Sequence, residues 1–234
     1  MQHEHDHHEP PEQMVNPLPA VVAALFLVLI GIEVAFYLGA RGIVGGPGAV
    51  GWRLDAIQRF AFSPEILTWM RETGRWPVEH LLRFVSYAFI HTGFTHALFV
   101  SVFLLAMGKM VAEVFGPLQM LTIFVASAFG GSLAYGLLAP DAPALIGGFP
   151  AVYGLIGGFT YILWLSLSSV GANQSRAFSL IAMLMGLQLL FGLVFGGAPD
   201  WIADLAGFAT GFGLSFVLSP GGWARLLQKL RNRD

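Results

Sequence analysis

Six long runs of apolar residues make up most of the chain, and short polar or glycine-containing stretches separate them. Each run is about as long as the ~20 residues that a helix needs to cross ~30 Å of hydrocarbon. The pattern therefore predicts an all-α integral membrane protein with six transmembrane helices. Their expected positions are approximately 17–40, 83–108, 118–138, 149–168, 177–196 and 200–219, which places the membrane domain at residues 17–220.

One connection in this pattern is long, residues 41–79, and we predict that it lies on the outer membrane surface. Its glycine-rich start leads into two amphipathic segments, one at about 52–62 and one that begins after Ser63 and should end at Gly74. Serine before a helix, proline in its first turn and glycine after its last turn are typical boundaries. The apolar side chains expected at headgroup level are Trp52, Phe60, Phe62, Trp69, Met70 and Trp76.

Composition agrees with a membrane protein and narrows the possible functions. Hydrophobic residues make up 56% and charged residues 11% of the 234 residues, whereas roughly a quarter of the residues in soluble domains are charged. The net charge of −2 argues against a nucleic-acid partner. Because the chain has no cysteine, it has no disulfide framework, and cysteine usage gives no information on its compartment.

The two ends of the chain are expected to be polar tails. Residues 1–16 are rich in histidine and acidic residues and lack lysine and arginine, which predicts a disordered tail. Residues 221–234 form a basic tail. The histidines that could bind a metal ion in the first tail are His3, His5, His7 and His8.

The basic residues of short loops predict the orientation, because they mark the cytoplasmic side. Lys109 follows the second predicted span, Arg176 precedes the fifth, and the basic tail follows the sixth. Both termini are therefore expected in the cytoplasm, and we expect the protein in a bacterial inner membrane. The arginines of the long loop oppose this count, but a folded interfacial insertion weighs less than a short linker; they are Arg41, Arg53, Arg59, Arg71 and Arg75.

Ionisable residues inside the predicted spans are functional candidates, because they are costly to bury in lipid. Glu33 has a simpler structural interpretation, in which it reaches toward the outer surface or pairs with Arg41. His91 and His96 are five residues apart, and five helical steps turn through about 140°, so their rings should not share one face of a regular helix. We therefore expect no two-histidine metal site on this helix.

The fourth and sixth predicted spans carry matching stripes of small residues. In the sixth span the stripe follows the spacing i, i+3, i+7, i+11 and consists of Asp204, Gly207, Gly211 and Ser215. In the fourth span it consists of Pro150, Gly154, Gly157, Gly158 and Tyr161. Glycine-lined faces let helix backbones approach closely in lipid. We predict that the two spans touch, with Asp204 near Phe149.

Three short motifs occur in a fixed order along these spans. They are the H-x4-H of His91 and His96, the glycine-rich turn GGFPAVYG at 147–154, and ADLAGFATG at 203–211. In these motifs, and in the Trp52-Arg53 pair of the long loop, the chain resembles the rhomboid family of intramembrane serine proteases. The resemblance covers roughly residues 50–220. It implies a six-helix rhomboid-like bundle with a long interfacial first loop and both termini in the cytoplasm.

The residues that carry the family's chemistry are replaced in this chain, according to the same resemblance. Of the site residues, only His96, matching an oxyanion histidine, and Tyr153, matching a tyrosine that packs against the catalytic pair, are retained. The replaced positions are those of the nucleophilic serine (Phe149), the glycine after it (Pro150), the general-base histidine (Asp204) and the oxyanion-binding asparagine (Val100). The residues expected to serve packing or binding are Gly147, Gly148, Gly154, Gly158, Gly207, Gly211, Trp52 and Arg53.

These replacements favour a protein without protease activity. Serine-type acyl transfer needs a hydroxyl, a base within hydrogen-bond reach and donors for the oxyanion, and a phenyl ring supplies none of them. The favoured hypothesis is a pseudoprotease that binds transmembrane segments of client or partner membrane proteins, such as a membrane protease or its substrates. The bilayer is the other expected partner, and no cofactor or metal is expected.

Two alternatives remain at this point. One is an active intramembrane endopeptidase that uses non-standard residues, such as an acid/base pair of Asp204 and His96. The other is an ion- or proton-handling protein built on the intramembrane Glu33, His96 and Asp204. Against the second, Asp204 is expected to cap the amino end of the fourth span, where the helix dipole favours a carboxylate.

Overall fold

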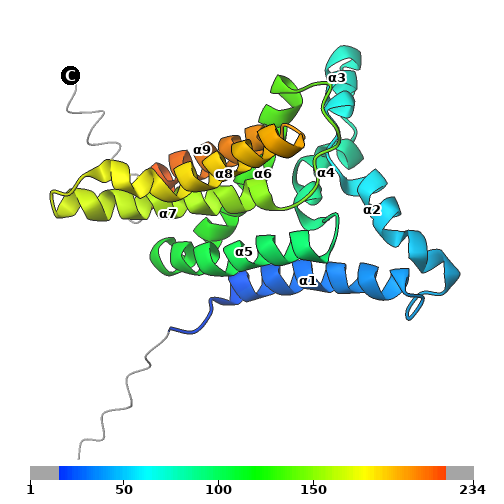
Figure 1. Ribbon diagram of the computed structural model, residues 1–234, viewed down its shortest axis with the longest axis horizontal. Helices are drawn as coiled ribbons and strands as arrows, with labels where there is room; N and C mark the ends of the chain where they lie inside the picture. Colours follow the sequence, from blue (N-terminus) through cyan, green and yellow to red (C-terminus); the bar gives the residue numbers. More distant parts are fainter. Residues whose placement is uncertain (1–15, 220–234) are drawn as a thin grey trace, which may run out of the picture.

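The computed structural model describes residues 16–219, and helices account for most of this part of the chain (Figure 1). Six helical stretches are long and apolar enough to span a membrane, which confirms the predicted fold class. They are α1 (Ala20–Ala40), α5 (Phe94–Phe115), α6 (Pro117–Leu138), α7 (Phe149–Ser169), Gln174–Phe195, which contains α8 (Ser179–Phe195), and α9 (Trp201–Leu218). The predicted tails, apart from residue 16, lie outside the described residues.

Short helices fill the connection between α1 and α5 and gather at one end of the long helices (Figure 1). They are a 3-10 helix at Pro47–Gly51, α2 (Trp52–Phe60), α3 (Pro64–Thr73), α4 (Val78–Ser86) and a 3-10 helix at Tyr87–Phe89. Gly74 ends α3 with φ of 67°, as predicted, whereas Ser63 precedes α3 without a capping side-chain hydrogen bond. The placement of this connection on the membrane surface stays a prediction, but Phe62 and Met70, expected at headgroup level, are buried in the core instead.

The predicted second span, 83–108, is wrong at its start. The helix α4 ends at Ser86, the backbone is extended at Ile90 and Gly93, and the spanning helix begins only at Phe94. Four of the apolar side chains in this stretch are buried within the protein: Phe84, Tyr87, Ala88 and Ile90. Hydropathy does not distinguish a protein interior from lipid, so the apolar residues of this packed segment have the same pattern as the first turns of a span.

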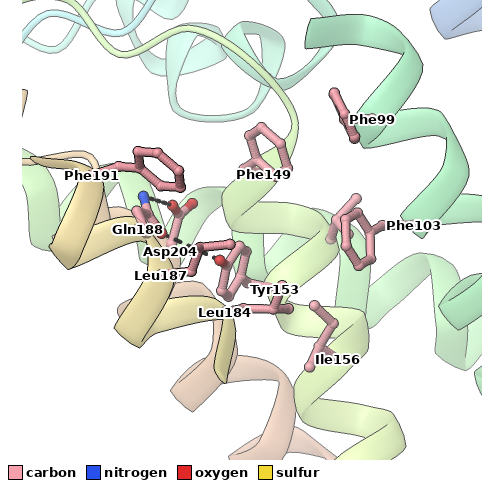
Figure 2. A pocket seen from close by; sticks show the side chains of 11 residues that line it. Phe99, Phe103, Phe149, Tyr153, Ile156, Leu184, Leu187, Gln188, Phe191 and Asp204 are labelled. Carbon is pink, nitrogen blue, oxygen red and sulfur yellow. Dashed lines mark hydrogen bonds between the residues drawn. The ribbon is translucent and has the colours of Figure 1, made fainter. Parts of the chain in front are cut away.

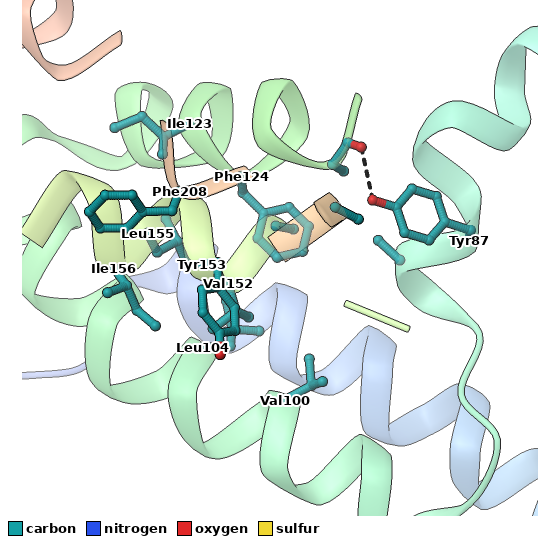
Figure 3. Packing of buried hydrophobic residues seen from close by; sticks show 14 of the residues in the cluster. Tyr87, Val100, Leu104, Ile123, Phe124, Val152, Tyr153, Leu155, Ile156 and Phe208 are labelled. Carbon is teal, nitrogen blue, oxygen red and sulfur yellow. Dashed lines mark hydrogen bonds between the residues drawn. The ribbon is translucent and has the colours of Figure 1, made fainter. Parts of the chain in front are cut away.

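The helix α7 is the most buried of the six spans and occupies the centre of the bundle. Figure 3 shows its Val152 and Ile156 among side chains from α5, α6 and α9. Its contact with α9 is backbone against backbone: a Cβ atom on Gly207 would meet the carbonyl oxygen of Pro150, and one on Gly211 would meet that of Gly154. The predicted contact between the fourth and sixth spans is therefore confirmed.

Glu33 is buried in α1, and its partner is Arg53 of α2 instead of the predicted Arg41. The two carboxylate oxygens accept hydrogen bonds of 2.6 and 3.0 Å from the guanidinium. Arg41 lies over the Tyr37 ring instead. Arg53 also donates to the carbonyl oxygen of His91 at 2.6 Å. One arginine therefore joins α1, α2 and the extended segment before α5.

Candidate functional site

The turn that leads into α7 is held by backbone hydrogen bonds from distant parts of the chain. Leu145 and Phe62 exchange both of their backbone bonds, at 2.8 and 3.2 Å, and form an isolated antiparallel bridge. The Gly147 N–H donates to the carbonyl oxygen of Tyr87 at 3.0 Å. Gly147 has φ of +105°, and a Cβ there would collide with the His96 ring. Glycine is therefore required at 147 both by the backbone conformation and by the neighbouring ring.

His91 and His96 lie against each other, contrary to the prediction. Their ring centroids are 5.0 Å apart with the planes at 87°, because His91 precedes α5 and no regular helix joins the two residues. The Nε2 atom of His91 accepts the Gly148 N–H at 3.4 Å, which requires a neutral ring. Burial, then the positive charges of His96 and Arg53, lower the pKa of His91 to about 3. His91 therefore fixes the turn as a neutral acceptor.

Phe149 begins α7 at the position that the resemblance gives to the nucleophile. Its ring stacks on that of His96, with centroids 5.3 Å apart and planes at 19°, and meets Tyr153 edge-on at 6.4 Å. Pro150 is the second residue of the helix, where a missing N–H costs nothing. Val100 is fully buried and packs under the turn beside Gly148. These three positions supply no nucleophile and no oxyanion donor side chain.

Asp204 of α9 is buried and close to Phe149, as predicted, and both residues line the same cavities. It does not cap α7, however. Its Oδ2 atom accepts a hydrogen bond of 2.8 Å from Nε2 of Gln188 in α8, and the Tyr153 hydroxyl donates to Oε1 of Gln188 at 3.2 Å (Figure 2). Its Oδ1 atom has no hydrogen-bond partner among the described residues. The carboxylate is oriented by α8 and by Tyr153.

Gln188 is the functional candidate that the sequence analysis missed. It is the only amide side chain in α8, whose other residues are apolar apart from Ser179. A polar residue within a membrane span is a functional candidate by default, so this signal was present in the sequence. The rule identifies Gln188 when it is applied to amides as well as to ionisable side chains.

Two cavities meet at this site and share Phe149, Gln188 and Asp204. The first has a volume of about 420 Å³ and is lined mainly by apolar side chains of α5, α7 and α8 (Figure 2). The second, of about 320 Å³, lies toward the turn before α7 and the start of α9 and is also lined by His96 and Asp200. The site is therefore an apolar chamber beside a smaller, more polar one.

The sequence-predicted packing residues contribute to the surroundings of this site. The Trp52 ring packs against Gly39 and Gly45, while Arg53 holds Glu33 and the His91 carbonyl. Within residues 16–219, no group of three or more histidine, cysteine, aspartate or glutamate side chains could hold a metal ion.

Comparison with protein families matches residues 78–221 to the Rhomboid domain. Similar curated proteins include RHOMBOID-like protein 4 of Arabidopsis thaliana, which is 32% identical over 139 residues, or 58% of this chain and 34% of that protein. RHOMBOID-like protein 5 of the same plant is 28% identical over 150 residues, which cover 64% of this chain and 46% of that protein. The putative rhomboid protease YdcA of Bacillus subtilis (strain 168) is 24% identical over 135 residues, 58% of this chain and 66% of that protein. The matched part is thus less than two thirds of the length of each of these relatives.

Proposed function

The chain belongs to the rhomboid family, and we propose that within this family it binds transmembrane segments of partner membrane proteins without hydrolysing them. One observation carries the proposal. The position of the family's nucleophile holds a phenyl ring that is stacked on His96, while the carboxylate at the position of the base is hydrogen-bonded to Gln188. No hydroxyl at position 149 is available for activation, and one oxygen of the carboxylate at position 204 accepts a hydrogen bond from Gln188.

The surroundings of the site support binding in place of chemistry. The backbone turn before α7 is held by hydrogen bonds and α7 packs closely on α9, which supports a scaffold that serves binding; the replacement of its reactive groups is what the resemblance implies. The apolar cavity is bordered by Phe99, Leu187 and Phe191, each about half-exposed on the membrane-facing perimeter of α5 and α8. A transmembrane segment in the bilayer could reach this opening from the side. Residues 17–220 would be the binding domain, in a bacterial inner membrane with both termini cytoplasmic.

A protease assay tests the loss of hydrolysis. The wild-type protein is compared in detergent with the quadruple variant Phe149→Ser, Pro150→Gly, Asp204→His and Val100→Asn, using a panel of single-span substrates. We expect no turnover by the wild type, because removal of a nucleophile and a base leaves only residual catalysis. Cleavage by the variant alone would support both the alignment and the loss. Wild-type turnover that is abolished by His96→Ala or Asp204→Ala would refute the proposal.

A photocrosslinking experiment tests the binding. A photoreactive phenylalanine analogue is introduced at Phe99, at the opening of the cavity, or at Leu137, which is 47% exposed near the end of α6 and serves as the control on the same side of the bundle. Each protein is reconstituted with defined single-span peptides. We expect crosslinks at position 99 in clear excess over position 137. Equal crosslinking at the two positions would indicate random collision in the bilayer and would contradict a binding role.

A further inference from the structure

We propose that the 420 Å³ cavity receives the ammonium group of a lysine carried by a transmembrane helix of the partner, with Asp204 as its acceptor. The proposal rests on the proposed function and specifies the partner. Asp204 is 2% exposed, yet its Oδ1 atom has no hydrogen-bond partner among residues 16–219. A buried carboxylate oxygen without a donor is costly, and a ligand that supplies one would remove that cost.

The direction of the hydrogen bonds sets the ligand's polarity. The Tyr153 hydroxyl donates to Gln188, and Gln188 donates to Asp204, so the chain of donors ends on the carboxylate. The one atom of this group without a partner is Oδ1 of Asp204, and a carboxylate oxygen accepts a hydrogen bond. Figure 2 shows this oxygen on the side of the carboxylate away from Gln188. The ligand must therefore donate a hydrogen bond.

The lining of the cavity favours a cationic donor on an apolar stem. Apart from Gln188 and Asp204, its walls are apolar or aromatic. Aromatic faces attract cations through their quadrupole, most strongly where water is excluded, and a carboxylate adds a full opposite charge. The aromatic residues are Phe99, Phe103, Phe149, Tyr153 and Phe191. An alkyl ammonium group combines an apolar stem and a charged end in the way these walls require.

The charges around the site favour a protein side chain over a phospholipid headgroup. Neither cavity is lined by a lysine or an arginine, and Asp200 adds a second carboxyl group beside Asp204. A zwitterionic lipid would bring its phosphate close to these carboxylates. The like charges would repel each other, and no lysine or arginine of the lining would pair with the phosphate. A lysine side chain carries no such phosphate. Because Asp204 is the fourth residue of α9, on the order of 5 Å from its start, the ammonium group would be required in the outer part of the partner's span.

The single free oxygen also distinguishes lysine from arginine. The guanidinium group binds carboxylates best through two parallel hydrogen bonds, whereas an ammonium group acts as a compact point charge. Because Gln188 occupies Oδ2, only Oδ1 is left without a partner. We therefore expect lysine to bind more tightly than arginine at the same position.

The test measures the affinity of the full-length protein in phosphatidylcholine nanodiscs for fluorescent single-span peptides. The peptides share a leucine–alanine sequence and differ at one position in the outer third, which carries lysine, arginine, acetyl-lysine or norleucine. We expect the lysine peptide to bind about tenfold or more tightly than the acetyl-lysine and norleucine peptides, as a charge-assisted hydrogen bond would give. In the isosteric variant Asp204→Asn, the ratio of the lysine affinity to the norleucine affinity should fall below about threefold, because the acceptor of the ammonium group is lost.

The outcomes separate this inference from the proposed function. If peptides bind but lysine shows no preference over acetyl-lysine, the lysine site is wrong and helix binding stands; this comparison needs no protein variant. If no peptide binds, both proposals fail. A lysine preference that persists in Asp204→Asn would place the interaction elsewhere. Loss of the preference when phosphatidylethanolamine is added to the nanodisc would assign the cavity to a lipid amine and overturn the proposal.

Discussion

Asp204 depends on a single amide for its position in the core. Gln188 donates to one carboxylate oxygen, and the Tyr153 hydroxyl holds the other end of that amide. Removing one partner of a buried hydrogen bond costs more free energy than replacing both partners by apolar groups, because the remaining polar group is left buried without a partner. This asymmetry gives a way to measure the role of Gln188 without an activity assay.

We expect Gln188→Leu to lower the free energy of unfolding by about 1–3 kcal/mol, because Asp204 then has no donor from the protein. The double replacement Gln188→Leu with Asp204→Leu should recover most of this loss. The measurement is reversible unfolding in mixed micelles, arranged as a double-mutant cycle with Asp204→Leu as the fourth corner. Additive effects of the two single replacements would mean that the pair does not interact.

His91 gives stability a defined dependence on pH. Its pKa is about 3 in the folded protein and 6.5 as the ordinary value, so between these values the unfolded state binds more protons. Stability therefore decreases as pH falls through 6.5 toward 3, by at most about 1.4 kcal/mol per pH unit from this residue. Above pH 6.5 the imidazole is neutral in both states and contributes no slope.

The pH dependence is measured as the difference between the wild type and His91→Gln, which cannot titrate but offers an amide acceptor to Gly148. We expect the wild type to lose stability more steeply than the variant below pH 6.5, with the two curves parallel above it. Titrating groups that do not interact with His91 cancel in the difference. Parallel curves over the whole range would show that His91 titrates in the same way in both states.

The residues of the candidate site differ in how far the sequence could predict them. Phe149 and Asp204 were placed together correctly, because glycine stripes on two spans specify which faces meet. The hydrogen bond from Gln188 to Asp204 could not be predicted, because no local sequence pattern indicates which side chains of α8 and α9 meet. The contact of His91 with His96 was missed because it depends on a break between Ser86 and Phe94.

At the scale of helices, the contact between α7 and α9 is the main constraint on the fold. The two backbones touch where Gly207 faces the carbonyl of Pro150 and Gly211 faces that of Gly154. No side chain, not even a methyl group, fits between them. By contrast, Gly213 lies on the same helix with no heavy atom within 4 Å of where a Cβ would be added, which makes it a matched control.

We expect Gly207→Ala to destabilise the protein by about 1–3 kcal/mol or more, because the methyl group forces α7 and α9 apart. Gly213→Ala should be neutral or stabilise by up to about 1 kcal/mol, since alanine favours the helix and meets no neighbour. Unfolding of both variants in the same micelles gives the comparison. Equal effects of the two substitutions would show that helix propensity, and not the α7–α9 contact, determines the result.

The extent of helices was predictable where lipid alone surrounds the apolar run. Five of the six predicted spans agree with the observed helices to within a few residues. The second does not, because the chain leaves the helix between Ser86 and Phe94, where the His91 carbonyl accepts a hydrogen bond from Arg53 of α2. That interaction joins residues far apart in sequence, so no local pattern of hydrophobicity could predict it.

At the scale of the whole molecule, the structure shows that one of the arginines that oppose the predicted orientation is neutralised by an ion pair. Arg53 is one of five arginines that opposed a cytoplasmic amino terminus, and its charge is compensated by buried Glu33. The exposed Asp141, in the connection between α6 and α7, lines a surface cavity together with residues of α3 such as Trp69. The long loop and the α6–α7 connection therefore lie on one side of the bundle. The α7–α8 connection, next to Arg176, is on the other side.

Because the chain has no cysteine, this arrangement can be tested with single introduced thiols in intact cells. We expect Asp141→Cys to react with a membrane-impermeant maleimide added outside, and Ser175→Cys, which is also exposed, to react only after the membrane is permeabilised. The reason is that basic residues are retained on the cytoplasmic side, where Arg176 would lie. Labelling of Ser175→Cys but not Asp141→Cys in intact cells would invert the topology. The cavity beside Asp204 would then open toward the cytoplasmic half of the bilayer, and a partner's lysine would be required in that half instead.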